Sequence, residues 1–369
     1  MRMKKIILYG VRHIELRRNI EFFLDDGYEI IGYSDTWYES DVIDGKRFIP
    51  PQQLCDESFD YIVPLSFKES VLADMCNALQ KNGVPGEKII KPLMFIHQSA
   101  EKMQLDLVKD IDEHYQEEPN LIYGLSYSLR GIHKDALKFP TYDCSWHSLD
   151  LYYNFKLFTY MRRQGRLPRQ GGKALLVFPY YIFDYDFSRT AYNYKVGTCF
   201  SLWRLDDWHH FQQAPDGADY VANYRMFGRK VSEFYHFQRY QHQNGGVYPG
   251  ENGTAELGKL WFRDHEVTAA ENKRLFSQFI RELREEDMMP VLIVPPYYMD
   301  GIDAQSRAAV SKKRERFYQI VREASGGRLT ILDYMDIYAH QRMFFTDLTH
   351  LNSRGAEAFT EQLNRDIFT

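Results

Sequence analysis

A serine near the start of the second part of the chain, and an aspartate and a histidine near its end, have the types and spacing for nucleophilic chemistry. Ser126 lies in the stretch LIYGLSYSLRGI (residues 121–132), where a short apolar run reaches Gly124 just before the serine. Asp347 and His350 lie three residues apart in TDLTHLNSRG, just before an amphipathic stretch. On a tight turn, a carboxylate at this spacing can bind one ring nitrogen of the histidine and leave the other to act as a base.

Each of these motifs also has a structural explanation when it is taken alone. An aspartate before a helix commonly caps it or favours its dipole, and serine is common in turns. In a parallel sheet, however, the loops after the carboxyl ends of the strands lie along one edge, so distant residues can meet there. A serine at the front of a helix also lies beside N–H groups that can stabilise an oxyanion. Ser128 is expected to be the N-cap of that helix.

The elements that would position these residues are strands and helices in alternation. In the first part of the chain, strands are expected at residues 4–10, 28–35, 59–66 and 87–92, and helices at residues 14–27 and 69–84. This alternation predicts a small, doubly wound parallel-sheet domain over residues 1–96. The charged, helix-prone residues 97–118 are expected to form a helical connector.

A second and larger α/β domain is predicted over residues 119–369. Its strands are expected at residues 121–124, 173–181, 290–298 and 328–334, and its helices at residues 148–165, 272–287 and 312–325, with a loop and a last helix in 344–368. Residues 183–265 are irregular and aromatic, which indicates an insertion. The predicted fold class is therefore α/β, with two doubly wound parallel sheets covered on both faces.

Composition limits the classes of function. The chain has 369 residues, of which 44% are hydrophobic and 26% charged, as in a soluble globular protein of two domains. The net charge of -5, with acids and bases interspersed, argues against binding to nucleic acid or to an anionic membrane. No stretch approaches the ~20 apolar residues of a membrane span, and the start MRMKKIILYG is too short in apolar residues for a signal peptide. We therefore expect a cytoplasmic location.

Metal and cofactor sites are not expected. The cysteines have no metal-type or redox spacing, which indicates buried, reduced thiols. They are Cys55, Cys76, Cys144 and Cys199. The histidines are also without a common metal motif, and packing or solvated roles are expected for them. The closely spaced pairs are His209 with His210 and His236 with His242.

The blocks around the serine and the histidine resemble those of the SGNH, or GDSL-type, hydrolase and acyltransferase superfamily. In that family the nucleophile lies in a Gly-Asp-Ser-like block near the domain start, and an Asp-x-x-His block lies near the end. Gly124-Leu125-Ser126 fits the first block, with Leu125 where the family usually has aspartate, and Asp347-Leu348-Thr349-His350 fits the last. The residues that follow are also typical, namely Leu351, Asn352 and Gly355. The resemblance covers residues 120–369.

The resemblance implies an SGNH-hydrolase-like, flavodoxin-type domain that carries a serine-dependent acyl-ester enzyme. Ser126 would be the nucleophile, His350 the base and Asp347 the acid that orients the histidine. Water as the acceptor gives an esterase, whereas a sugar hydroxyl gives an O-acetyltransferase. An α/β-hydrolase elbow fits less well, because its Gly-x-Ser-x-Gly pattern would need glycine in place of Ser128.

The oxyanion donors of the family are a glycine N–H and an asparagine side chain, and neither has a clear counterpart in this sequence. The backbone N–H of Ser148, after the next expected strand, is the candidate for the first donor. The hydroxyl of Tyr180 or of Tyr181 is the candidate for the second.

The N-terminal domain resembles the Rossmann-like domain found ahead of sugar acyltransferases and other polysaccharide-assembly enzymes. Its stretch YGVRHIELRRNI keeps only Gly10 of a Gly-x-Gly-x-x-Gly loop, with Arg12 and Glu15 in place of the other glycines. Asp35 ends the second expected strand, where an acid could hold a ribose or sugar hydroxyl. Binding of a nucleotide-sugar and a purely structural or docking role both remain open.

These resemblances lead to an expected function. The protein would transfer or remove an acyl group, expected to be acetyl, on a cell-surface polysaccharide or its sugar precursor. Aromatic residues make up 15% of the chain and suit saccharide rings, and residues 178–240 could form a lid or a glycan platform or simply pack together. The alternative is a catalytically silent carbohydrate- or nucleotide-sugar-binding assembly protein on the same scaffold.

Overall fold

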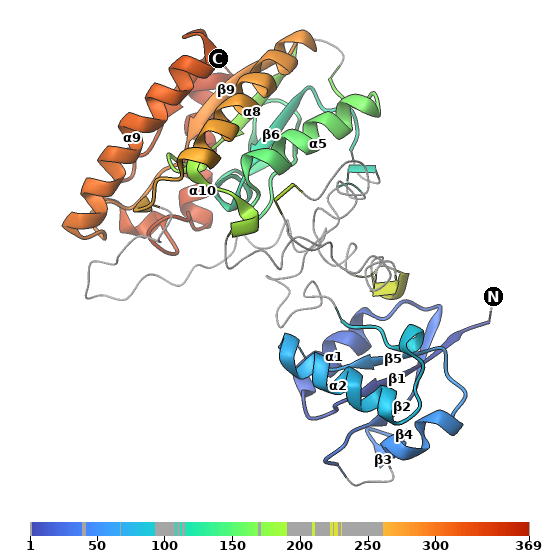
Figure 1. Cartoon of the computed structure of the whole chain (residues 1–369). Helices are drawn as coiled ribbons and strands as arrows, with labels where there is room; N and C mark the ends of the chain where they lie inside the picture. The colour runs from blue at the N-terminus through green and yellow to red at the C-terminus, as the bar shows by residue number, and fades with distance from the viewer. Residues whose placement is uncertain are drawn as a thin grey trace. The chain divides into compact units, whose positions relative to one another are not determined.

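The chain forms two compact α/β units, each built on one five-stranded sheet (Figure 1). The computed structural model describes residues 2–38, 42–66, 68–92, 108, 111–112, 115–168, 171–189, 209–210, 222–223, 225–227, 230 and 261–368. The first unit comprises Met1–Leu107 and Tyr194–Tyr240, and the second Val108–Asn193 and Gln241–Thr369. The predicted α/β class with two mainly parallel sheets is confirmed.

The sheet of the first unit has the strand order β3-β4-β2-β1-β5. Its strands are β1 (Lys4–Tyr9), β2 (Tyr28–Ser34), β3 (Val42–Ile43), β4 (Lys46–Phe48) and β5 (Tyr61–Pro64). Its helices are α1 (Ile14–Phe23) and α2 (Glu69–Lys81), with the 3-10 helices η1 (Pro51–Asp56) and η2 (Gly86–Lys88). Among the described strands of this sheet, only β3 and β4 pair antiparallel.

Alternate residues of β1 place their side chains in two separate cores. Ile6 and Leu8 pack in one cluster with apolar residues of α1, whereas Ile7 packs in a second cluster with Leu79 of α2. Successive side chains of a strand point to opposite faces, so this division means that both faces of the sheet are covered.

A segment distant in sequence completes the first of these cores. Met226 and Phe227 are fully buried in the cluster of Ile6 and Leu8. The N–H of Asp25 donates to the carbonyl of Met226 at 2.7 Å, and Asn223 Nδ2 donates to the carbonyl of Lys91 at 2.8 Å. These residues lie within the predicted insertion at 183–265, yet their contacts are with the N-terminal unit.

The sheet of the second unit is fully parallel, with the order β10-β9-β8-β6-β7. Its strands are β6 (Asn120–Gly124), β7 (Thr141–Asp143), β8 (Lys173–Val177), β9 (Met289–Val294) and β10 (Thr330–Asp333). Numbered within the unit, the order is 2-1-3-4-5, a doubly wound arrangement whose topological switch point lies between β6 and β8.

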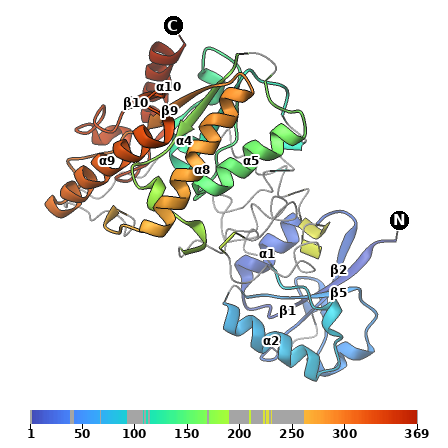
Figure 2. The same cartoon turned by 45° about the horizontal axis from the view of Figure 1, so that its top comes forward.

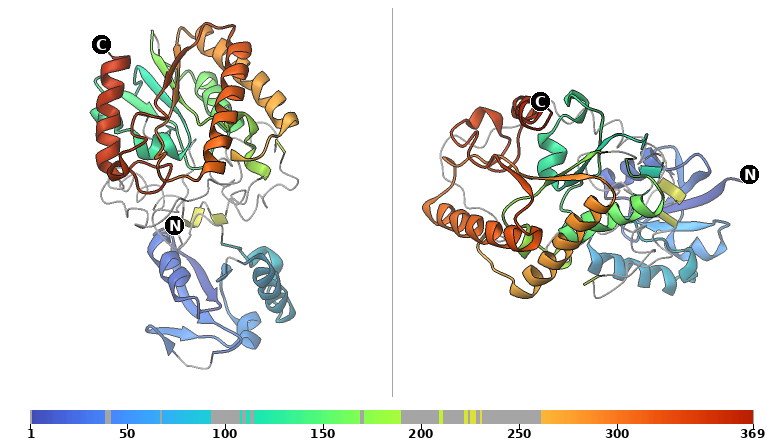
Figure 3. Two further views of the ribbon diagram at one scale, coloured as in Figure 1. Left: turned by 90° about the vertical axis from the view of Figure 1, so that its left-hand side faces the viewer. Right: turned by 90° about the horizontal axis from the view of Figure 1, so that it is seen from above.

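Helices cover both faces of this second sheet (Figures 2 and 3). They are α4 (Ser126–Gly131), α5 (Leu151–Arg163), α8 (Glu266–Glu285), α9 (Ala304–Ser325) and α10 (Ser353–Ile367), with η5 (Lys134–Ala136), η6 (Ile182–Asp184), η7 (Phe187–Arg189) and η10 (Arg342–Phe344). The Tyr123 ring meets Phe158 of α5 and Phe279 of α8, with centroids 6.5 and 5.3 Å apart. Its neighbour Ile122 packs on the other face, in a cluster with Phe359 of α10.

Several predicted elements were wrong in detail. Strands β3, β4 and β7 were missed because two or three residues are too few to show an alternating pattern. Residues 87–92 form no strand: they include the end of η2 and an isolated bridge between Ile62 and Ile89. Helix α9 starts eight residues earlier than predicted, because the side chain of Asp303 caps it by accepting from the Ser306 N–H.

The cysteines are not uniformly buried, contrary to the prediction. Cys144 is buried, Cys76 is half-buried and Cys55 is exposed, and Cys199 lies outside the described residues. Among the described helices, none has both the length and the apolar character needed to cross a bilayer.

Candidate active site

Ser126 lies at the end of β6, where α4 begins. Leu125 takes the cap position in an extended conformation, so Ser126 is the first helical residue. Glycine is required at position 124, because a Cβ atom there would lie 2.3 Å from Ser128 Oγ and 2.9 Å from the carbonyl oxygen of Val177. The Ser128 hydroxyl donates to the carbonyl of Leu125 at 2.9 Å from inside the first turn. The prediction that Ser128 is the N-cap was therefore wrong.

Asp347 shapes the turn that carries His350. Its Oδ1 accepts the N–H of Thr349 at 2.8 Å and the N–H of His350 at 2.9 Å. The Thr346 N–H donates to the His350 carbonyl at 2.9 Å and closes the turn. The carboxylate therefore fixes the local backbone as well as contacting the imidazole.

The residues after the turn join it firmly to α10. Asn352 Oδ1 accepts the N–H of Gly355 at 3.0 Å as the N-cap, and its Nδ2 donates to the Met343 carbonyl at 2.9 Å. A Cβ atom at Gly355 would lie only 2.2 Å from the Phe344 carbonyl oxygen. The Asn-and-Gly pattern after the histidine thus has a structural role.

Ser126, His350 and Asp347 form one hydrogen-bonded chain. Ser126 Oγ lies 2.8 Å from His350 Nε2, although 224 residues separate the two in sequence. His350 Nδ1 lies 2.8 Å from Asp347 Oδ2 and 3.1 Å from Oδ1. If Nδ1 carries the proton that Asp347 accepts, Nε2 has a free lone pair for the proton of the serine. The structure thus brings together the three residues singled out as nucleophile, base and acid.

Asp347 carries its negative charge over a wide pH range. Burial acts to raise the pKa of its carboxyl, but hydrogen bonds from His350 and from two backbone N–H groups outweigh it and hold the pKa well below its usual value. An ionised carboxylate at this position can stabilise an imidazolium when His350 takes up a proton.

Tyr127 is a residue of this site that the sequence did not indicate. Its ring stacks on the His350 imidazole, with centroids 5.2 Å apart and planes inclined by 14°. Its hydroxyl lies 2.9 Å from the hydroxyl of Tyr181, and its ring lies 5.5 Å from that of Tyr297. Burial raises the pKa of Tyr127 and of Tyr297, so both stay neutral. In sequence, Tyr127 resembles any aromatic residue of a core helix, and only its place beside the serine marks it.

The candidate oxyanion donors lie in different places. Ser148 follows β7, the neighbour of β6, and has a left-handed backbone with φ of 64°. Its carbonyl accepts the hydroxyl of Tyr185 at 2.7 Å. The Tyr181 hydroxyl lies 2.9 Å from that of Tyr127, whose ring stacks on His350. The Tyr180 hydroxyl instead donates to Asp333 Oδ2 at 2.5 Å, at the end of the edge strand β10. This geometry gives no support to Tyr180 as an oxyanion donor.

Buried polar contacts hold the loop after β8 that carries Tyr181. Asn272 Nδ2, from α8, lies 3.3, 3.0 and 3.0 Å from the carbonyl oxygens of Ile182, Phe183 and Tyr185. Asp184 pairs with Lys313 of α9. The aromatic side chains of residues 178–187 are buried, so this part of the predicted lid or platform packs in the core. Most of residues 190–240 lie outside the described residues.

The residues of the N-terminal unit that were candidates for binding a nucleotide or sugar have structural roles in turns. Gly10 has φ of 92°, and a Cβ atom there would lie 2.4 Å from the end of the Met75 side chain. Asp35 is buried, and its Oδ1 accepts the N–H of Trp37 at 2.7 Å. At the start of α1, His13 Nδ1 accepts the N–H of Leu16 at 3.3 Å. These contacts account for Gly10 and Asp35 without a nucleotide.

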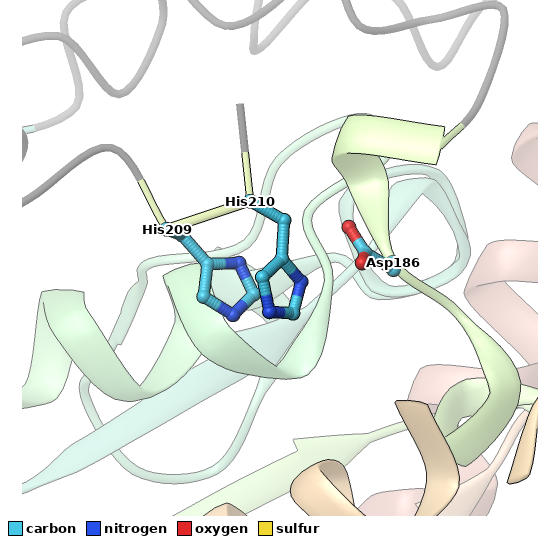
Figure 4. A group of neighbouring side chains, drawn as sticks. All are labelled: Asp186, His209 and His210. Atoms are coloured by element: carbon cyan, nitrogen blue, oxygen red, sulfur yellow. The ribbon is translucent and has the colours of Figure 1, made fainter. Parts of the chain in front are cut away.

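Two adjacent histidines stack on one another in the first unit. The rings of His209 and His210 have centroids 3.9 Å apart and planes inclined by 24° (Figure 4). Asp186, also labelled there, belongs to the second unit, where it accepts the Ser188 N–H at 3.0 Å and pairs with Arg189 at 3.2 Å. Because these residues belong to separate units, we do not assign them a common metal site. His236 and His242 lie outside the described residues.

Comparison of the chain with models of known protein families gives no match, and no curated protein matches it either.

Proposed function

We propose that the protein is a serine-dependent acyl-ester enzyme of the SGNH type, acting through Ser126, His350 and Asp347. One observation carries the proposal: two contacts of 2.8 Å connect the serine, the histidine and the aspartate in the order that proton transfer requires. The 2-1-3-4-5 strand order supports it, because Ser126 follows β6 at the switch point where open α/β sheets bind their ligands.

The reaction follows from this arrangement in two half-reactions. Ser126 Oγ attacks the ester carbonyl carbon while its proton passes to His350 Nε2, and Asp347 stabilises the imidazolium that results. His350 then returns the proton to the leaving alcohol as the ester C–O bond breaks, which leaves an acyl-serine. An acceptor hydroxyl next gives its proton to His350 and attacks the acyl carbon, and the proton returns to Ser126 Oγ as the acyl-serine bond breaks.

The acceptor and the substrate are further parts of the proposal. Water as the acceptor makes the protein an esterase, and a sugar hydroxyl makes it an O-acetyltransferase. A cell-surface polysaccharide or its sugar precursor is the proposed substrate. This part rests on the resemblance of the N-terminal unit to the domain found ahead of sugar acyltransferases and other polysaccharide-assembly enzymes, and on the aromatic content of 15%. Binding of a nucleotide-sugar at the N-terminal unit is not carried by Gly10 or Asp35, since both have structural roles in turns.

The decisive experiment combines turnover with covalent labelling. Wild-type protein should hydrolyse p-nitrophenyl acetate and react with a fluorophosphonate at Ser126, as located by peptide mass mapping. Ser126→Ala and His350→Ala should abolish both. His340→Ala is a matched control, because His340 Nδ1 lies 2.8 Å from Asp300 in a second Asp–His pair on the surface. Wild-type protein that neither turns over the ester nor takes the label would favour the silent binding protein.

A further inference from the structure

Two features of Tyr127 go beyond ordinary core packing. Its ring lies nearly parallel to the imidazole of His350, with an inclination of 14°, in place of the edge-to-face contact that aromatic pairs often adopt. It also immediately follows Ser126 on the first turn of α4, so one short helix presents the nucleophile and the surface against which the base lies.

The hydroxyl of Tyr127 has a fixed partner. It lies 2.9 Å from the hydroxyl of Tyr181, in the loop that Asn272 holds through three carbonyl oxygens. Tyr127 and Tyr181 are both buried, at 8% and 7% exposure. The ring is therefore held at both ends, by the α4 backbone and by this hydroxyl contact.

Such a ring can act on the base in two ways. A flat face against the imidazole restricts rotation of the imidazole plane and so keeps Nε2 directed at the serine. This matters because a small misplacement of a catalytic group lowers the rate by a large factor. The same face also attracts the imidazolium that forms during the reaction, because the ring quadrupole is negative at its face.

We infer that Tyr127 is the positioning residue of this site, with its ring setting the plane of the His350 imidazole and its hydroxyl anchored by Tyr181. The inference rests on the proposed function, since it concerns the same serine and histidine. The described titratable groups around the imidazole are Asp347 on its own turn and Tyr127 on α4, with Tyr181 and Tyr297 behind.

Two substitutions at Tyr127 test the effect of the ring and the effect of its hydroxyl contact separately. Tyr127→Leu removes the stacked face, and we expect kcat for p-nitrophenyl acetate to fall about 10- to 100-fold with KM changed less than about twofold. Tyr127→Phe keeps the face and loses the anchor, so kcat should fall only about fivefold.

The anchor itself is tested by a double-mutant cycle. Tyr181→Phe removes the same hydroxyl contact from the other side without touching the imidazole. The double variant Tyr127→Phe/Tyr181→Phe should be no slower than the slower single variant, within about twofold, because both changes remove one interaction. Thermal unfolding of each variant shows whether a loss of rate reflects a loss of folded protein.

The outcomes are distinct. If Ser126→Ala keeps wild-type turnover, the proposed function fails and this inference fails with it. If Ser126→Ala is inactive but folded Tyr127→Leu keeps kcat within twofold, the proposed function stands and the positioning role is overturned. Fully additive losses in the two phenylalanine variants would overturn the anchoring by Tyr181.

Discussion

Asp347 contacts the imidazole of His350 through both carboxylate oxygens while 53% of its side chain remains exposed. The side chain of His350 is only 21% exposed. Solvent screens the charge of an exposed carboxylate, so its attraction for a distant or newly formed charge is reduced. Orientation through hydrogen bonds does not depend on this screening to the same extent. The acid of the proposed triad should therefore contribute more to geometry than to charge stabilisation.

This relationship predicts a graded loss of activity across the triad. Ser126→Ala and His350→Ala should each lower kcat by at least about 10³-fold, because each removes a group that handles the transferred proton. Asp347→Asn should cost less than either, about 100-fold, because the charge that it removes is half exposed to solvent, although the amide NH2 that then faces Nδ1 disfavours the tautomer in which Nε2 accepts a proton. Asp300→Asn, in the separate pair with His340, should leave kcat unchanged. An Asp347→Asn variant as slow as His350→Ala in the p-nitrophenyl acetate assay would contradict this.

A pH-dependent contribution to stability is expected from Asp264. A hydrogen bond from Lys312 lowers the pKa of this carboxyl to about 2, helped by Lys313 and opposed by burial. Because the folded pKa lies below the unfolded value of about 3.9, the stabilisation is fully present above about pH 4 and is lost as the pH falls towards 2.

The measurement is urea unfolding of wild type and Asp264→Asn as a function of pH. The difference in unfolding free energy should be constant between pH 5 and 7 and should shrink towards zero near about pH 2. Asp300→Asn serves as a surface control. A difference that stayed the same down to pH 2 would show that the charge of Asp264 is not its cause.

The pair between Lys313 and Asp184 should be a strong determinant of stability in the second unit. Its side chains are 1% and 2% exposed, and Lys313 Nζ also donates to the Arg263 carbonyl at 2.6 Å. Asp184→Asn removes the buried carboxylate and leaves the Lys313 ammonium with Asp264 Oδ1, at 3.0 Å, as an acidic partner. The change should therefore lower the free energy of unfolding by about 3 kcal/mol.

The neighbouring Lys312 provides the contrast for this pair. It also meets Asp264, but its side chain is 69% exposed. Lys312→Ala should therefore cost no more than about 1 kcal/mol in the same denaturation experiment. Equal losses in the free energy of unfolding for Asp184→Asn and Lys312→Ala would mean that burial of the pair does not increase its contribution to stability.

The N-terminal unit should depend on a residue far from it in sequence. Phe227 is fully buried in the cluster of Ile6 and Leu8, so Phe227→Ala should destabilise this unit by about 3–5 kcal/mol. Phe22→Ala, at a ring that is 61% exposed in the same unit, should change it by about 0.5 kcal/mol or less. Amide hydrogen exchange in β1 reports on both variants, and unchanged protection in Phe227→Ala would refute the prediction.

The candidate triad could be predicted because its parts obey local or topological rules. Asp347 and His350 lie on one short turn, where a spacing of three residues is enough to bring their side chains together. Ser126 could be linked to them because parallel strands present their carboxyl ends on one edge of the sheet. The alternation of strands and helices revealed both sheets for a similar reason, since buried strands and amphipathic helices differ in period.

The remaining features depend on contacts that no local pattern contains. Tyr180 and Tyr181 are adjacent, and only the folded chain shows that one hydroxyl reaches Asp333 and the other Tyr127. The stacking of Tyr127 on His350 depends on how α4 lies against the turn before α10. The burial of Phe227 joins segments about 200 positions apart in the chain, which a reading of neighbouring residues cannot detect.

The carboxylate of Asp184 also sets how the long excursion between Arg189 and Trp261 can change. Asp184 lies before the chain leaves the second unit, and its Oδ1 accepts the N–H of His265, after the chain has returned, at 2.9 Å. The chain segments before and after this excursion are thus joined by a hydrogen bond, whatever the number of residues between them. The excursion is more than a loop, because Met226 and Phe227 within it are fully buried in the core of the N-terminal unit. An insertion or deletion in this excursion must therefore keep both the contact between Asp184 and His265 and the burial of Met226 and Phe227 if the two units are to keep their cores.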